Sequence, residues 1–433
     1  MKRYTLVLFF MACIALLSAC SAVGKATGAD PLPSEDGATE ITVEVDDAVG
    51  FYQRAAQRFE KSTGIKVNVI NHYSDTQSGE AEDYAYLDRI PGELMAGKGA
   101  DIYADIDLDF TAMGRKGCLC NLADWIAADS DFTDEKYYLN IMISAFDVGN
   151  RYSIPLFMVF QAYGSEIEIP ELEGKNLNWE EFFELSKGIN KNGVFIGLTD
   201  YQIFNQRFMD RYDSYIDEKS KTENINTPET IRLLEQCKAW SEQGLCIPYH
   251  TDQYEDMFKN ALLKEYVSGV NALINLRPQG DFIGGISYSY DIPSDSGKND
   301  KANKLLTVNQ ICVNAASPNK GTAWKFVKYL LREDIQDTSY LTPLNRSAAE
   351  SEISRTVTSD MGYSIQDDEA KQAIRDAKAV LDAIEDIPSK SYRLYIVYNV
   401  IAQEARRFFN DEISAEEAAR NMAESARLYM KEQ

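Results

Sequence analysis

The stretch that decides the fold is ITVEVDDAVGFYQRAAQRFEKSTGIKVNVI, residues 41–70. Its first five residues alternate Ile or Val with polar side chains, which is typical of a strand, and residues 65–70 repeat that pattern. Gly64 precedes the second run, at the position where a left-handed helix cap costs least. The residues between predict a helix whose apolar face carries Phe51, Tyr52, Ala55, Ala56 and Phe59. Strand, helix and strand in this order predict a parallel βαβ unit and an α/β fold.

The rest of the chain continues to mix strands and helices. Capping residues mark several helix starts, namely Asn178 with Glu181, Thr227 before Pro228, and Ser414 with Glu417. Further strands are expected at 100–104, 269–276, 283–292 and 306–313, and further helices at 321–331 and 392–409. The roughly 390 residues after position 40 are enough for two domains of ordinary size.

The first residues of the chain resemble an export signal. Two basic residues precede an apolar run over 6–17, which is too short for a flanked membrane span. The run ends in Leu17-Ser18-Ala19-Cys20, which resembles the bacterial lipobox. In signals of that kind, residues 1–19 would be removed and Cys20 acylated to anchor the chain in the membrane. The alternative is an ordinary signal peptide cut near Ala19.

A flexible tether is expected between the lipidated Cys20 and the folded body. Residues 21–40 are small and polar and include Pro and Gly, which is the composition of a linker. As a random coil, such a segment would separate its ends by roughly 25 Å.

Composition excludes some partners and leaves others open. Acidic residues outnumber basic ones by 68 to 44, for a formal net charge of −24, so nucleic acid is excluded as a partner. Outside the signal and Cys20, the cysteines are Cys118, Cys120, Cys237, Cys246 and Cys312. Their number is odd, and a Cys237–Cys246 disulfide across a helix end is left open. With only two histidines, no Cys/His metal site and no cofactor are expected.

Seven segments, in order along the chain, resemble the extracellular solute-binding proteins of ABC transporters, family 1, the maltose-binding type. They are FEKSTGIKVNV at 59–69, GKGADIYA at 97–104, GCLCNLADWIAAD at 117–129, GNRYSIPLFM at 149–158, LNWEEF at 177–182, VNAASPNKGTAWKFVKYLLREDIQ at 313–336 and TPLNRSA at 342–348. The chain departs from the family at 160–163, where a Tyr-Asn pair is usual, and at 259–264, where a Gly-rich run is usual. These departures imply a solute different from that of the best-known members.

The resemblance implies a two-lobed, type II periplasmic-binding-protein-like α/β fold, with hinge strands and a ligand cleft between the lobes. The first lobe would take 41–153 and 292–340, and the second 154–291 and 341–433. Chain crossings are expected at 152–155, 288–293 and 341–345. The implied function is capture of a small solute, a sugar or oligosaccharide, by hinge closure, and delivery to the membrane permease subunits of an ABC importer. The protein would act outside the cytoplasm as a lipid-anchored monomer.

Candidate solute-binding residues follow from the same resemblance. The acidic loop at Asp105, Asp107 and Asp109 would face the cleft. Its carboxylates would contact the solute, form a solvated loop or helix cap, or bind Ca²⁺, although the EF-hand glycine and distal glutamate are absent. The other candidates are aromatic or polar residues near the expected crossings and turns, namely Tyr73, Phe157, Tyr201, Arg277, Gln279, Tyr392 and Tyr395.

Other classes of function fit the sequence less well than solute binding. The chain has no G-x-S-x-G, H-E-x-x-H or phosphate-binding glycine loop, so no enzymatic activity is expected. A ligand sensor for a membrane kinase would have the same fold, and the acidic loop leaves a cationic solute open. A surface adhesin would not close around a ligand.

Overall fold

The computed structural model describes residues 30–73, 85–144, 151–189, 193–217, 220–268, 288–290, 293–295, 305–336, 341–383 and 400–432. It confirms the predicted βαβ unit as β1 (Glu40–Val45), α2 (Phe51–Thr63) and β2 (Lys66–Asn71). The two strands pair in parallel, and the five predicted apolar residues are the buried face of α2. Gly64 ends α2 at φ 75°, and its N–H donates to the carbonyl of Glu60 at 2.8 Å.

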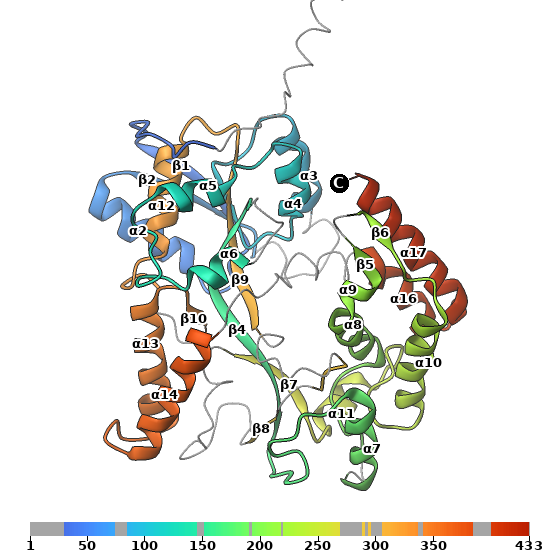
Figure 1. Ribbon diagram of the computed structural model, residues 1–433. Helices are drawn as coiled ribbons and strands as arrows, with labels where there is room; N and C mark the ends of the chain where they lie inside the picture. The colour runs from blue at the N-terminus through green and yellow to red at the C-terminus, as the bar shows by residue number, and fades with distance from the viewer. Residues whose placement is uncertain are drawn as a thin grey trace, which may run out of the picture.

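One eight-stranded sheet runs through the molecule, with the path β10-β4-β9-β3-β1-β2 (Figure 1). The predicted third strand, β3 (Ile102–Ala104), pairs in parallel with β1, and β9 (Leu305–Val313) lies antiparallel between β3 and β4 (Ile154–Ser165). The other partners of β4 are β7 (Lys264–Ser268), β8 (Tyr288–Tyr290) and β10 (Thr342–Pro343). The strand predicted at 269–276 lies outside the described residues.

The long strand β4 joins two separate hydrophobic cores. Phe157 and Phe160, in its first half, belong to the core that surrounds β1, β2 and β3. Tyr163, near its end, belongs to a second core built mainly from helices. The chain therefore has two lobes, and β4 passes from one to the other without a break.

The first lobe packs helices on the parallel part of the sheet. They are α3 (Ala85–Met95), α4 (Phe110–Arg115), α5 (Leu122–Ala128), α6 (Leu139–Ser144) and α12 (Lys320–Leu330). The rings of Phe59 and Phe326 meet edge to face at 5.2 Å between α2 and α12, and Trp125 meets Trp324 at 5.4 Å between α5 and α12. Aromatic contacts thus fix α12 against both of its neighbours.

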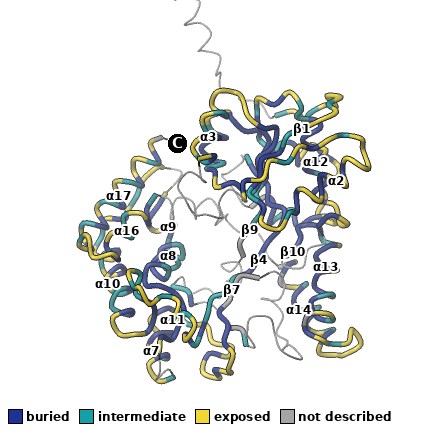
Figure 2. The backbone as a smooth tube through the Cα atoms, turned by 180° about the vertical axis from the view of Figure 1, so that it is seen from behind, coloured by how far each residue is buried: buried dark blue, intermediate teal, exposed yellow. Residues whose placement is uncertain are grey.

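Two later helices also pack on the first core. They are α13 (Arg346–Arg355), continued by a short π-helix at Thr356–Asp360, and α14 (Asp368–Ala383). Ala349 and Ile353 of α13, and Ala377 and Leu381 of α14, are buried in the first core. The sequence had grouped 341–433 with the second lobe, so that boundary is corrected for 341–383. Figures 1 and 2 both show these helices on the side of α2 and α12.

The second lobe is largely helical. Its elements are α7 (Trp179–Ile189), α8 (Asp200–Asp210), α9 (Tyr212–Tyr215), β5 (Ile216–Asp217), β6 (Thr222–Glu223), α10 (Pro228–Glu242), α11 (Tyr254–Lys259), α16 (Ala402–Phe409) and α17 (Ala415–Glu432). The predicted caps are confirmed. Asn178 and Glu181 exchange hydrogen bonds of 3.0 and 2.9 Å, and the Thr227 hydroxyl accepts from Thr230 N at 3.2 Å. The Ser414 cap likewise accepts a hydrogen bond in the first turn of α17, at 3.2 Å.

The predicted flexible tether is wrong from Asp30 onward. Asp30 hydrogen-bonds at the start of α5, and Asp36 hydrogen-bonds at the start of α12. The side chains of Glu35 and Lys325 form an ion pair at 2.6 Å. The composition of this segment matches a linker, but its acidic side chains find partners on the first lobe.

Several chemical features of the described residues bear on function. All five cysteines there are buried and free, so the Cys237–Cys246 disulfide left open by the sequence is not formed. No group of three or more His, Cys, Asp and Glu side chains in this part of the chain is arranged to hold a metal ion. None of the helices in the same ranges has the length and apolar character needed to cross a membrane.

Candidate functional site

Polar loops converge at the carboxyl edge of the parallel strands. Asp46 and Asp47 follow β1, His72 and Tyr73 follow β2, and Asp105 follows β3. Because β2, β1 and β3 are parallel neighbours, these loops leave the sheet at the same edge. Ligands of open α/β sheets bind at this edge.

The loops after β1 and β2 are tied to each other. The carboxylate of Asp47 accepts hydrogen bonds from the backbone N–H groups of Val49 and Tyr52, at 3.0 and 2.9 Å, and so caps the entry to α2. The backbone of Asp47 is in turn bonded to both ends of the Asn71 amide, at 3.0 and 2.9 Å. This part of the edge is therefore held in one conformation without a ligand.

A buried charged network lies beside these loops. Glu44 accepts from Arg89 at 2.7 Å and lies 2.9 Å from Nε2 of His72. The His72 ring stacks on Tyr86, with 4.2 Å between centroids, and the Tyr86 hydroxyl donates to Asp46 at 3.0 Å. These contacts join β1, β2 and α3, so the network supports the edge from behind.

Asp105 is the most perturbed carboxyl group of the edge. Burial raises its pKa to about 7, against the opposing influence of the neighbouring Asn309 and Tyr52 side chains. Asp105 and Asn309 both have left-handed backbones, at φ 56° and 55°, and the Asn309 amide donates to the Asp105 carboxylate. Asp and Asn tolerate this conformation better than other side chains. Burial also raises the pKa of Tyr52 well above its ordinary value, and the negative charge of Asp105 raises it further.

The two other aspartates of the loop differ in role. Asp107 is exposed and makes no hydrogen bond or ion pair with the rest of the described chain. Asp109 caps α4, since one of its oxygens accepts from Ala112 N at 2.8 Å. Its other oxygen accepts from the Tyr429 hydroxyl of α17 at 2.5 Å, which joins the first lobe to the second. Figure 1 shows the end of α17 beside α3 and α4, and Figure 2 shows it beside α3 from the other side.

The second lobe contributes a polar cluster on β4, β7 and α8. Glu265 of β7 accepts from Gln206 at 2.8 Å and from Gln161 at 3.4 Å. The Tyr163 hydroxyl donates to the Gln206 side-chain oxygen at 2.7 Å. Burial raises the pKa of Glu265. A carboxylate and two amides within one network are groups that recognise hydroxyl-rich molecules.

Two of the predicted aromatic contacts are core residues instead. Phe157 is 1% exposed, and its ring meets Phe51 edge to face at 5.4 Å. Tyr201 is 6% exposed, and its hydroxyl accepts from Arg406 at 3.2 Å inside the second core. Neither ring is accessible to a solute in this structure, so these two predictions are corrected. Tyr73, in contrast, is 38% exposed at the end of β2.

The remaining predicted residues lie outside the described ones. They are Cys20, Arg277, Gln279, Tyr392 and Tyr395. The structure also adds residues that sequence reasoning missed, namely Tyr52, Asn309 and Tyr429 around this edge, and Glu265 in the second-lobe cluster. None of the four carried a usable local signal; Glu265, for example, follows Lys264 in a strand of mixed polarity.

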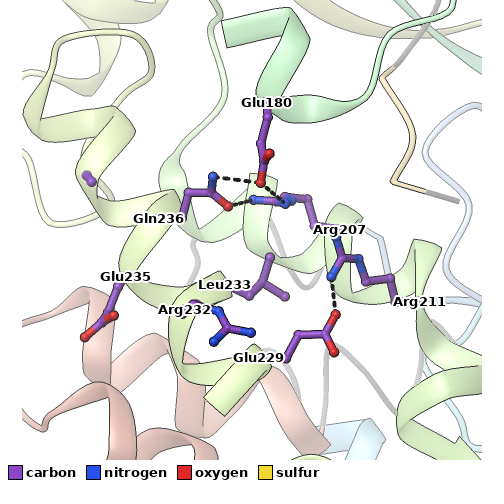
Figure 3. Close-up of a pocket in the computed structure, with 9 residues that line it drawn as sticks. Glu180, Arg207, Arg211, Glu229, Arg232, Leu233, Glu235 and Gln236 are labelled. Carbon is purple, nitrogen blue, oxygen red and sulfur yellow. Dashed lines mark hydrogen bonds and ion pairs between the residues drawn. The ribbon is translucent and has the colours of Figure 1, made fainter. Parts of the chain in front are cut away.

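A separate pocket of about 530 Å³ lies within the second lobe, between α7, α8 and α10 (Figure 3). Two of its three arginines are engaged by protein acids and amides. Arg207 binds Asp295 at 2.7 Å, and Arg211 binds Glu229 at 2.5 Å. Because all of its lining residues belong to the second lobe, the pocket is not the interlobe site.

Comparison with known proteins agrees with the two-lobed architecture. Residues 54–363 match the family model described as bacterial extracellular solute-binding protein. No curated protein matches the chain.

Three solved structures share the fold. The first is an ABC transporter solute-binding protein from Thermotoga lettingae TMO bound with α-D-tagatose, with a TM-score of 0.59, 16% identity and coverage of 91% of this chain and 100% of that one. The second is the maltose/maltodextrin-binding domain MalE from Bdellovibrio bacteriovorus bound to maltotriose. Its TM-score is 0.58 and its identity 14%, with coverage of 90% of this chain and 100% of that one. The third is the GacH receptor of Streptomyces glaucescens GLA.O, solved unliganded and with acarbose. Its TM-score is 0.57 and its identity 17%, with coverage of 91% of this chain and 99% of that one.

The family match covers well over half of the chain, and it agrees with the family that the seven sequence segments predict. The three solved structures share this fold over about nine tenths of the chain. The chain belongs to the bacterial extracellular solute-binding protein family.

Proposed function

We propose that this protein captures a carbohydrate between its two lobes and delivers it to the permease of an ABC importer. The observation that carries the proposal is the hydrogen bond from Tyr429 of the second lobe to Asp109 of the first, beside the acidic edge. It shows that the two lobes approach each other at that edge. A solute that contacts both lobes there favours the closed state by its differential affinity.

The chemistry of the edge suits a hydroxyl-rich solute. Asp107 offers a free carboxylate, and Asp105 either accepts or donates a hydrogen bond near neutral pH because its pKa is about 7. Tyr73 supplies an exposed ring for stacking on a sugar face. Tagatose, maltotriose and acarbose in the three similar structures support the same class of solute.

The remaining site residues stay part of the proposal. Arg277, Gln279, Tyr392 and Tyr395 are proposed as second-lobe contacts, and Asp109 as a residue of the closing contact rather than of the solute shell. Cys20 is proposed as the acylated residue that holds the protein at the outer face of the membrane. No reaction is assigned to the protein.

A thermal-shift screen of the full chain tests the proposal. Monosaccharides, oligosaccharides, polyamines and Ca²⁺ would be compared, and a true ligand at a hundredfold excess over Kd adds about 2.7 kcal/mol of stability. We expect one sugar class to raise the Tm, with the shift reduced in Asp107→Asn. The control is Asp252→Asn, which changes an exposed carboxylate in the second lobe just before α11 and should keep the shift.

Two outcomes would change the proposal. Shifts with polyamines alone, lost in Asp107→Asn, would replace the sugar with a cationic solute. If a sugar raises the Tm but cells without this protein still take up that sugar normally, the result would favour a ligand sensor that signals to a membrane kinase. No shift with any compound would contradict small-solute binding.

A further inference from the structure

The segment from Asp30 to Ala38 is fastened to the first lobe at two helix starts. Asp30 accepts from Asn121 N at 3.0 Å, and its own N–H donates to Asp124 at 2.8 Å, at the start of α5. Asp36 accepts from Thr322 N at 3.0 Å and from the Thr322 hydroxyl at 2.5 Å, in the first turn of α12. We name residues 30–38 the strap.

The strap supplies a cap that α12 lacks on its own. The residue before this helix, Asn319, makes no side-chain capping bond, so the free N–H groups of the first turn need another acceptor. The carboxylate of Asp36 fills that role from 286 residues away along the chain. Burial by itself would raise the pKa of Asp36. Hydrogen bonds from Thr322 and from neighbouring backbone groups have the larger combined effect, so the pKa lies below its ordinary value. A negative charge at this end of a helix is also favoured by the helix dipole.

The first lobe is shaped to admit the strap. A Cβ at Gly321 would stand 2.0 Å from the carbonyl oxygen of Ser34 and 3.3 Å from the Asp36 carboxylate. The backbone of Gly321 is not in the left-handed region, so its own conformation does not require glycine. The close approach of the strap is what requires glycine at this position.

We propose that the strap fixes the face formed by the starts of α5 and α12 toward the lipid bilayer. The proposal rests on the acylated Cys20 of the proposed function. If residues 20–41 were free, the chain would reach at most about 70 Å from its anchor, whereas docking at Asp30 limits the reach to about 35 Å. The docked strap therefore orients the first lobe and keeps its α5–α12 face nearest the membrane.

Hydrogen exchange on the full chain tests the docking itself. In Gly321→Ala the strap is expected to detach, so Glu-C should cleave after Glu35 and the Thr322 amide should exchange about fivefold faster, the effect of losing one cap. Gly188→Ala is the matched control, because Gly188 also lies within a helix and has open space where a Cβ would be. Both changes favour the helix, so general unfolding is not expected to mimic detachment.

A second experiment tests the orientation. Fluorophores at Ala316→Cys, four residues before α12, and at Glu333→Cys, past the far end of α12, would report energy transfer to acceptors in vesicles that carry the acylated protein. We expect stronger transfer from position 316 than from 333, and loss of this difference in Gly321→Ala. Equal transfer in the parent protein would overturn the orientation, and equal cleavage after Glu35 in all variants would overturn the docking. An absent acyl mass on Cys20 would refute the anchor instead, without altering the exchange result.

Discussion

Because Tyr429 and Asp109 form a hydrogen bond between the lobes, removal of the Tyr429 hydroxyl should shift the equilibrium between the open and the closed arrangement of the lobes. Tyr429→Phe keeps the ring on α17 and removes the hydroxyl that donates to Asp109 at 2.5 Å. Asp109 itself remains, so the cap of α4 is preserved. The variant therefore isolates the contact between the lobes from the stability of either lobe.

The size of the effect follows from the geometry. A hydrogen bond to a charged acceptor contributes about 1.5–3 kcal/mol when both groups are buried. Tyr429 and Asp109 are each partly exposed, so solvent screening reduces the contribution to about 1–1.5 kcal/mol. At 25 °C this lowers the ratio of closed to open molecules about 5- to 12-fold. When the free protein is mostly open, the Kd for the solute rises by the same factor.

Single-molecule energy transfer between the lobes measures this ratio without knowledge of the solute. Dyes at Lys61→Cys on α2 and Glu242→Cys on α10 occupy exposed positions, and the five native cysteines of the described chain are buried. We expect the distribution for Tyr429→Phe to move toward longer distances. The control, Tyr254→Phe, alters a tyrosine on α11 and should leave it unchanged. Identical distributions for Tyr429→Phe and the parent protein would refute the reasoning.

Two further predictions concern stability. The pKa of Asp105 is raised to about 7, so the folded state holds a proton that the unfolded state releases near pH 4, and the parent protein loses stability as pH rises between these values. Asp105→Asn should therefore gain in unfolding free energy relative to the parent at pH 8 but not at pH 4, and a difference independent of pH in urea titrations would contradict this. Gln336 is fully buried and bonds the Leu156 carbonyl of β4 at 2.6 Å and the N–H of Asn345, the residue that caps α13, at 3.0 Å. Gln336→Ala should cost about 1–3 kcal/mol because it leaves the Asn345 N–H unpaired, whereas the Leu156 carbonyl still accepts from Leu344 N. The exposed Gln53→Ala should cost almost nothing, and equal urea midpoints for the two variants would show the Gln336 bonds to be unimportant.

Features set by neighbouring residues could be predicted from the sequence. The turn at Gly64 and the caps at Asn178 and Thr227 depend on partners within four residues, so the pattern contains all the information that is needed. The order of strands and helices in the βαβ unit followed for the same reason. The seven family segments supplied the two-lobed arrangement, which no local pattern encodes.

Features set by distant partners could not be predicted. The strap looked like a linker because the partner of Asp36, Thr322, lies 286 residues away. The apolar residues of α13 and α14 predict that one face of each helix is buried, but they do not indicate which of the two cores that face packs on. Phe157 was misplaced because the first half of β4 is buried on both faces, so its sequence has no alternation to show which side meets solvent.

The pairing of β4 with β9 also fixes the order in which this protein is completed during export. Ile154 pairs with Ile311, and Phe160 with Leu305, so roughly 150 residues separate the two strands along the chain. Strands β1 to β3 emerge first. Strand β9, which lies between β3 and β4 in the sheet, emerges only after most of the second lobe. A chain threaded from its N-terminus therefore exposes the edges of β3 and β4 until the third quarter of the polypeptide has emerged. Such unpaired edges are prone to aggregation until β9 has paired with both strands.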